Sequence, residues 1–554
     1  MRWPTLVRAR TSGALVAVLL SGYAASAWAQ QPDPAPPPEG SAPPAEPPPA
    51  PPPSAGVLPR VEPPKPPETT EAPAGSPAPG TPKPAETGAI LPEAQKTLPA
   101  IPAPEVRPEE NRPDVFSFGS YGRMIMATDG RGGPGRDADI VARGSRLDEY
   151  NYVELELRRE DSWVKTGART RVVATLAVAN PVFHYNGQFD IRMAVRNLYI
   201  QEQGLIHKDL SLWVGSRMYR GDDIYLLDWW PLDNLNTVGA GARFNIKERT
   251  TVAVHGGLSQ PENNFYNQDV DRPSPANGFG ANTINVLDRQ KFIGSAKFSH
   301  IVPLPDGAGL KAVAYAEAHA LPSGQKETDP GVFEDLPADD GFVVGAQLGG
   351  FTGKRDTHLN LFLRYSRGLA SYGEWGSPTS LALDRTTTGA SEFLVALGGN
   401  WEMGPVGVLL GAYFRTFRNA NPDLDFGDVD EGIFAVRPHV FFGEVGGIAV
   451  EASHQVQQRG VLLPKDSPPG QAPEPGAPDG PLTGSVTRFG IVPFLSPAGK
   501  GDFSRPQFRI IYTVSLRSDG ARRLYPQDDI FNLRSTEHFF GVGAEWWFNS
   551  SYGG

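Results

Sequence analysis

Between Val115 and Phe548 the chain alternates apolar and polar residues in segments of about ten residues, and turn residues separate them. Because successive side chains of a strand point to opposite faces, each such segment predicts a β-strand with one apolar and one polar face. The segment FSFGSYGRMIM places Phe116, Phe118, Met124 and Met126 on one face and Ser117, Gly119, Tyr121 and Arg123 on the other. YNYVELELRRE and HLNLFLRY repeat the pattern.

The links between these segments alternate in length. KERT, PLPDGAG, KRDT and AGKGD are short, whereas 261–288, 320–340 and 458–484 are long. A soluble β-sandwich would also alternate in polarity, but short turns at one end and long loops at the other are typical of outer-membrane barrels. The charges along the polar face fit a water-filled interior. We predict an all-β fold, a transmembrane antiparallel β-barrel of about 18 strands over 115–548, wide enough for an aqueous channel.

The N-terminus carries an export signal. Arg2, Arg8 and Arg10 precede the apolar run GALVAVLLSGYAA, and Ala27-Trp28-Ala29 fits a cleavage site. We therefore expect a signal peptide at 1–29 and a location in the outer membrane of a Gram-negative bacterium. Residues 549–554, NSSYGG, form a short C-terminal extension after the last aromatic residue of the barrel.

Residues 30–114 differ from the rest of the chain. They are rich in proline and contain no Phe, Trp or Tyr. Such a composition buries no core, and proline removes the donors that a β-ladder needs. We predict a disordered, polyproline-II-rich periplasmic tether. An inert spacer is one interpretation; a partner in peptidoglycan or a periplasmic protein is the other.

Composition excludes several classes of function. Cysteine is absent, so the exported chain holds neither a disulfide nor a thiolate metal site. The formal net charge of −11 argues against nucleic acid as a partner. No H-E-x-x-H, G-x-S-x-G or glycine-rich phosphate loop is present. His439 and Ser453 could be considered as a catalytic pair, but they are linked only by strand positions that would both point to the interior. We therefore expect no enzyme and no cofactor.

The stretch YRGDDIYLLDWWPLDN at 219–234 combines aspartates, an arginine and aromatic residues. A sugar is apolar on its ring faces and polar at its rim, so a path for sugars needs aromatic platforms flanked by arginines and carboxylates. We predict that this stretch is the third outer loop and that it folds inward to set the width of the pore.

Five pieces of the sequence, in order, resemble the maltoporins, which are 18-stranded trimeric outer-membrane channels for maltodextrins and related sugars. They are FGSYGR, RLDEYNYVELEL, WVGSRMYRGDDIYLLDWW, FSRPQFR and GAEWWF. The resemblance spans 115–548. It implies a homotrimer surrounded by outer-membrane lipid, an aromatic slide along the channel and charged polar tracks beside it.

The resemblance assigns slide positions to Tyr121, Tyr152, Phe503 and Trp547. Parity along the predicted strands independently places all four on the inner face, with Phe503 in the seventeenth strand beside Arg505. On the second outer loop, a family tryptophan that reaches into the neighbouring channel is replaced by PVFHYNGQF, so Phe183 or Tyr185 takes that role. Phe362 faces inward by parity and is the candidate for the remaining slide position.

The resemblance also assigns the polar tracks and the constriction. The polar-track residues are Arg123, Arg146, Glu154, Arg196, Arg220 and Asp228. Two positions depart from the family pattern. Gly221 replaces a track arginine, with Arg220 one residue earlier, and Trp230 replaces the tyrosine that narrows the constriction. The second change removes a hydroxyl and adds bulk, which affects the choice of sugar.

We therefore predict a porin for facilitated diffusion of maltose or maltodextrin-like oligosaccharides. A general or anion-preferring porin for small polar solutes is the alternative, since arginines recur on the predicted inner strands at Arg169, Arg171, Arg192 and Arg196. A third interpretation is a barrel that mainly anchors the proline-rich tether.

Overall fold

The computed structural model describes residues 115–179, 191–273, 281–352, 357–422, 427–460 and 481–549. The expected signal peptide (1–29), the expected tether (30–114), Phe183 and Tyr185 lie outside these ranges. Of the C-terminal extension only Asn549 lies within them.

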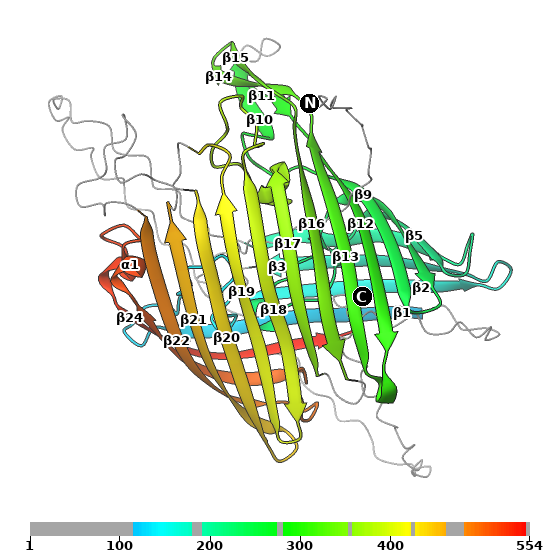
Figure 1. The fold of residues 1–554 in the computed structure, drawn as a ribbon, viewed down its shortest axis with the longest axis vertical. Coiled ribbons are helices and arrows are strands. Elements are labelled where there is room, and N and C mark those ends of the chain that lie inside the picture. Colours follow the sequence, from blue (N-terminus) through cyan, green and yellow to red (C-terminus); the bar gives the residue numbers. More distant parts are fainter. Residues whose placement is uncertain are drawn as a thin grey trace, which may run out of the picture. The chain divides into compact units, whose positions relative to one another are not determined.

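Eighteen strands form one closed antiparallel sheet, which confirms the predicted barrel and its strand number. Each strand pairs with its neighbours in chain order, and β1 pairs with both β2 and β24, which closes the ring. Figure 1 shows consecutive strands side by side around the barrel. The strands are β1 (Val115–Thr128), β2 (Tyr152–Trp163), β3 (Ala168–Ala179), β4 (Arg192–Gln203), β5 (Leu210–Ser216), β8 (Val238–Ile246), β9 (Thr250–Ser259), β12 (Lys291–Pro303), β13 (Gly309–Leu321), β16 (Asp339–Phe351), β17 (His358–Gly368), β18 (Ser391–Met403), β19 (Val406–Arg418), β20 (Val429–Phe442), β21 (Gly446–Arg459), β22 (Leu482–Leu495), β23 (Gln507–Arg517) and β24 (Thr536–Phe548).

The two faces of each strand follow the predicted alternation. On β1, Phe116 and Met126 are 68% and 71% exposed on the outside, whereas Tyr121, on the inside, is 2% exposed. On β2, Leu155 and Leu157 point outward and Glu154 and Glu156 are buried. An apolar outer belt suits the hydrocarbon layer of a membrane, and the polar side chains gather inside.

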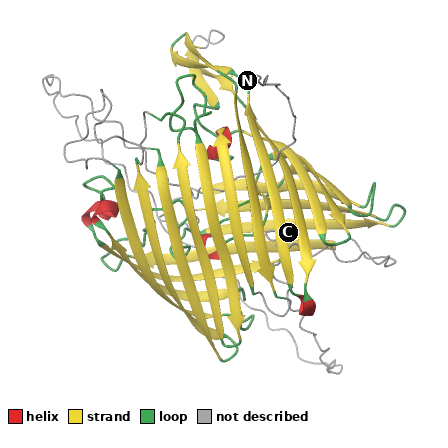
Figure 2. Cartoon of the chain, viewed as in Figure 1, coloured by secondary structure: helices red, strands yellow, loops and turns green. Residues whose placement is uncertain are grey.

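Long loops lie at one end of the barrel and short turns at the other (Figure 2). Two long loops carry small hairpins, β10 (Asn267–Pro273) with β11 (Ala281–Asp288) and β14 (Gly324–Asp329) with β15 (Val332–Leu336). The helical segments are short: η2 (Tyr225–Leu227), η3 (Pro305–Gly307), η4 (Leu369–Tyr372), α1 (Asp519–Arg522) and α2 (Ile530–Leu533). Within the described ranges, no helix has the length and apolar character to cross a membrane.

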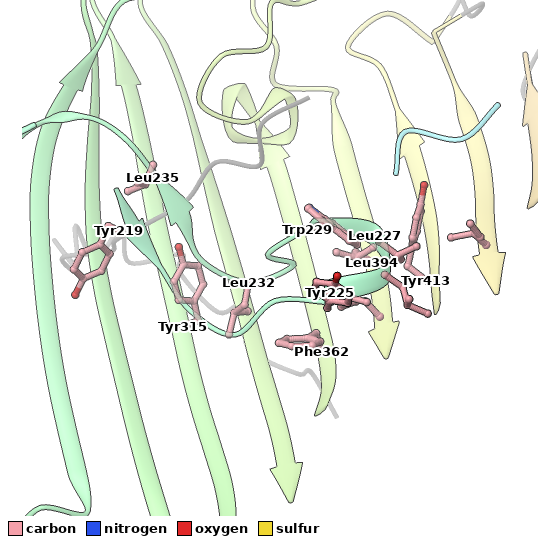
Figure 3. Packing of buried hydrophobic residues seen from close by; sticks show 14 of the residues in the cluster. Tyr219, Tyr225, Leu227, Trp229, Leu232, Leu235, Tyr315, Phe362, Leu394 and Tyr413 are labelled. Atoms are coloured by element: carbon pink, nitrogen blue, oxygen red, sulfur yellow. The ribbon is translucent and has the colours of Figure 1, made fainter. Parts of the chain in front are cut away.

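The loop after β5, residues 217–237 and here called loop 3, folds into the barrel as predicted for 219–234. Its base is closed by the pairing of β6 (Tyr219–Arg220) with β7 (Asn234–Leu235). Figure 3 shows its apolar side chains packed against the wall residues Tyr315, Phe362, Leu394 and Tyr413. The wall has glycine where the loop comes closest: a Cβ at Gly398 or Gly411 would lie 2.9 Å from Ile224. Loop 3 is therefore part of the interior core.

A second loop, residues 129–151 and here called loop 1, also enters the barrel, which the sequence did not indicate. The backbone N–H of Ile140 donates to Gln455 at 3.0 Å, and that of Ala142 donates to Glu431 at 3.1 Å. These acceptors lie on β21 and β20, so polar wall side chains hold loop 1 inside. The interior is thus narrowed by two loops rather than by one.

Candidate functional site

A row of aromatic rings lines the inner face of β2, β1 and β24. Tyr121 and Trp547 are directly paired across β1 and β24, and their rings stack with centroids 6.5 Å apart at 16°. The ring of Tyr152 lies 6.0 Å from that of Tyr121 on the other side. Three adjacent strands therefore contribute one ring each at similar height.

Loop 3 extends this row. The ring of Tyr225 meets Trp547 edge-on at 6.2 Å and meets Phe503 edge-on at 5.4 Å. Phe503 in turn stacks on His358 at 6.3 Å. Sequence reasoning missed Tyr225, although it lies in the stretch that first suggested sugar recognition.

The structure corrects the expected position of Phe503. We placed it in a strand, but β23 begins only at Gln507, and Phe503 lies in the connection 496–506. Its ring is still 8% exposed among the interior residues because this connection, of which AGKGD is only a part, turns inward. Arg505, in the same connection, donates to Glu545 at 2.7 Å and anchors the turn to β24.

Buried arginines and one carboxylate surround the rings. Glu545 on β24 is 1% exposed and accepts hydrogen bonds from Arg146 and Tyr225, each at 2.8 Å. It also pairs with Arg505 and with Arg509. A single carboxylate therefore pairs with three guanidinium groups, which come from loop 1, the inward turn and β23. The sequence prediction did not include Glu545, since nothing local in the sequence marks it as the centre of this cluster.

The predicted polar-track residues form two further groups. In the first, Arg123 pairs with Asp228 at 2.9 Å and with Glu149 at 3.1 Å. Both Arg123 and Arg146 donate to the Tyr121 hydroxyl, at 3.0 Å and 2.8 Å. These donors hold the Tyr121 ring at its hydroxyl and leave its faces apolar.

The second group lies beside Tyr152. Arg196 pairs with Glu154 at 3.2 Å, and the Tyr152 hydroxyl bonds with both. Arg220 lies over the ring of Trp230 with its guanidinium carbon 3.9 Å from the ring centroid. A predicted track arginine therefore covers the ring of the predicted constriction residue.

The opposite wall of the barrel carries a ladder of charges. Arg364 on β17 pairs with Glu392 on β18 at 2.5 Å, and Glu392 pairs with Arg415 on β19 at 2.7 Å. Arg415 continues to Glu431 on β20 at 3.0 Å. Loop 3 joins this side through Asp222, which pairs with Lys311 at 2.7 Å.

The carboxylates of loop 3 differ in their tendency to ionise. Burial raises the pKa of Asp223 to about 7, and the neighbouring charge of Asp228 adds to the effect. Burial also opposes ionisation of Asp228, but Arg146 and Arg123 outweigh it and lower the pKa of Asp228 to about 2. Asp228 is therefore an anion at neutral pH, while Asp223 is poised to titrate.

The remaining predicted residues lie elsewhere. Phe362 faces inward and lies fully buried beneath loop 3. Phe183 and Tyr185 lie outside the described residues. His439 lies beside Asp502 at 2.8 Å, whereas Ser453 pairs across the sheet with Ala435.

A closed antiparallel barrel with an apolar outer belt and an interior of rings and paired charges defines a channel-forming porin of the outer membrane. Comparison with known proteins supports this class and narrows it. The family model described as LamB porin matches residues 116–548. The chain belongs to the LamB porin family.

The chain is also similar to curated relatives and, at a low level, to solved structures. Two proteins named maltoporin, from the El Tor Inaba and Classical Ogawa strains of Vibrio cholerae serotype O1, are each 26% identical over 465 residues. The match covers 78% of this chain and 95% or 94% of theirs. Two solved structures, OccAB1 of Acinetobacter baumannii and the anion-selective porin from Comamonas acidovorans, are 9% and 10% identical. The matched regions cover 82% and 79% of this chain and 99% and 100% of the two solved chains, with TM-scores of 0.38 and 0.36. Likeness at these scores adds nothing to the family assignment.

Proposed function

We propose that this porin carries sugars, oligosaccharides of the maltose and maltodextrin kind, across the outer membrane by facilitated diffusion. The observation that carries the proposal is the row formed by Tyr152, Tyr121, Trp547 and Tyr225, with ring centroids 6.0 to 6.5 Å apart. Relatives named maltoporin support the choice of sugar. We further propose that the chain works as a homotrimer, with a signal peptide at 1–29 and a tether at 30–114.

The chemistry of the row suits a sugar that must keep moving. The apolar face of a pyranose stacks on an aromatic ring, and its rim hydroxyls hydrogen-bond to charged groups. Arg123, Arg146 and Asp228 lie at the edge of the Tyr121 ring, where such a rim would pass. Because these charges are already paired with one another, each new contact is weak, and a sugar is held without being trapped.

Alanine substitutions on the row test the proposal. In planar bilayers, we expect Tyr152→Ala and Phe503→Ala each to weaken sugar block of the single-channel current by about two- to tenfold, the range for one aromatic contact. The open conductance should change little. Phe116→Ala is the matched control, since Phe116 is 68% exposed on the outer face. Unchanged sugar block in both inner-face variants would remove the basis for the slide.

Liposome swelling distinguishes the alternatives. Swelling rates that saturate with maltodextrin length support the sugar channel. Rates that follow solute size alone would instead indicate a general porin, and absence of swelling would indicate a barrel that only anchors the N-terminal segment.

A further inference from the structure

Arg143, one of the arginines of loop 1, is held in a fixed position inside the barrel. Its backbone N–H donates to the Tyr413 hydroxyl at 3.1 Å, and the preceding residue, Ala142, is held by Glu431 at 3.1 Å. The next residue must be glycine, because a Cβ on Gly144 would lie 1.5 Å from the carboxylate of Asp139. That carboxylate is itself held by Arg488 at 2.7 Å. The turn that carries Arg143 is therefore locked on both sides.

The guanidinium group of Arg143 differs from the other interior arginines around it. Within the described part of the chain it has no hydrogen bond and no carboxylate within ion-pair distance; its contact is the ring of Trp229, at 6.0 Å. Its neighbours each have an acid partner at 2.9 Å or less: Arg123 with Asp228, Arg146 with Glu545, Arg364 with Glu392, and Arg415 with Glu392. A contact with a ring face leaves the N–H donors of a guanidinium group unused.

The surroundings of Arg143 carry excess positive charge. Burial, and then the charges of Arg415 and Arg364, lower the pKa of Arg143 to about 10, so it remains a cation at neutral pH. Arg364 and Arg415 are paired with Glu392 and Glu431, so Arg143 is a third cation beside two pairs that already balance. The carboxylate whose charge acts on Arg143, Asp228, is itself paired with Arg123. This contrasts with the chain as a whole, whose formal net charge is −11.

We propose that Arg143 is an anion-recognition residue that binds the carboxylate or phosphate group of an acidic sugar, so that the channel takes acidic sugars in preference to neutral ones of equal length. The inference rests on the proposed sugar channel and names a preferred substrate class within it. The planar guanidinium fork matches two oxygens of a carboxylate or phosphate, and charge-assisted pairs of this kind are stronger than hydrogen bonds between neutral groups. An anion bound there also supplies the negative charge that the three arginines lack.

The test compares a neutral sugar with its own acid. Maltotriose and maltotrionate, the acid formed by oxidising its reducing end, are titrated against single-channel current of the full-length porin at low ionic strength. We expect maltotrionate to bind about tenfold more tightly than maltotriose. Arg143→Gln should abolish that advantage without changing maltotriose binding. Arg143→Lys, which keeps the charge but loses the fork, should keep part of it.

Arg131→Gln is the matched control, because it removes the same charge from an exposed position in the same loop. It should preserve the advantage of the acid. Equal binding of acid and neutral sugar by the wild type, or an advantage that survives Arg143→Gln, would overturn the inference. Open conductance and the heat-induced shift of the barrel in gel electrophoresis show that each variant is folded.

A third ligand, inorganic phosphate, separates failure of the inference from failure of the proposed function. If maltotriose does not bind the wild type, the sugar channel is wrong. Phosphate block that depends on Arg143 would then still support the anion site, whereas phosphate block that is the same in Arg143→Gln would overturn it.

Discussion

The two inner walls of this barrel handle charge in different ways. The ring wall, defined by Tyr121, Tyr152, Trp547 and Glu545 on β1, β2 and β24, gathers its arginines around one carboxylate that is 1% exposed. The ladder wall, defined by Arg364, Glu392, Arg415 and Glu431 on β17 to β20, alternates acids and bases from strand to strand. The Arg364 and Arg415 side chains there are 15% and 23% exposed, whereas Arg146, Arg505 and Arg509 around Glu545 are 4%, 1% and 10% exposed.

This difference in exposure sets how much each wall depends on its individual charges. A charge that water can reach is rehydrated when its partner is lost, whereas a buried charge without a partner keeps the full desolvation penalty. Arg415 and Glu431 also face each other directly in the register of β19 and β20, so each rung forms between neighbours in the sheet. The cluster around Glu545 depends instead on loop 1, loop 3 and the inward turn being in place together.

Removing the charge of Glu545 gives the largest expected effect. Glu545→Gln leaves Arg146, Arg505 and Arg509 without a buried carboxylate, so we expect the free energy of unfolding to fall by about 3–5 kcal/mol. Urea unfolding of the refolded barrel, followed by tryptophan fluorescence, measures the change. Glu545→Asp keeps the charge and should lose less. A loss below about 1 kcal/mol for Glu545→Gln would show that water reaches the ring wall as well.

The equivalent change on the ladder wall should be milder. Glu392→Gln breaks the pairs with Arg364 and Arg415, but both arginines can turn to water, and Arg415 keeps Glu431. We expect a loss of about 1–2 kcal/mol in the same unfolding assay. If Glu392→Gln destabilised the barrel as much as Glu545→Gln, the two walls would not differ in the way that their exposure indicates.

The sequence predicted what each strand determines locally. The faces of β1 and β2 follow from side-chain alternation within one segment, so the barrel and the inward direction of Tyr121 and Tyr152 could be deduced. The cluster around Glu545 could not, because Arg146 and Glu545 are 399 positions apart and meet only when loop 1 folds inward. Phe503 was misplaced for a related reason. Its position depends on a turn that Arg505 anchors to another strand, and side-chain alternation within one segment does not reveal that contact.

The smallest expected effect comes from loop 3, which lies between the two walls and carries two adjacent aspartates with different surroundings. Asp222 is paired with Lys311, which outweighs burial and lowers the pKa of Asp222. Burial raises the pKa of its neighbour Asp223 to about 7. Asp222 is therefore ionised throughout the neutral range, whereas Asp223 gains its negative charge only as the pH rises through about 7.

The preference of the channel for cations over anions should therefore increase from about pH 5.5 to about pH 8.5, as measured by the reversal potential in a KCl gradient. Asp223→Asn should make this step smaller. Part of the step should remain, because burial also raises the pKa of Glu149 to about 7. Asp222→Asn is the comparison variant: it should shift the reversal potential at every pH and keep the size of the step, but move the step to lower pH, because the charge of Asp222 contributes to the raised pKa of Asp223. Coincident pH curves for the wild type and Asp223→Asn would mean that Asp223 keeps one protonation state across this range, and that the space between the walls is wetter than its burial indicates.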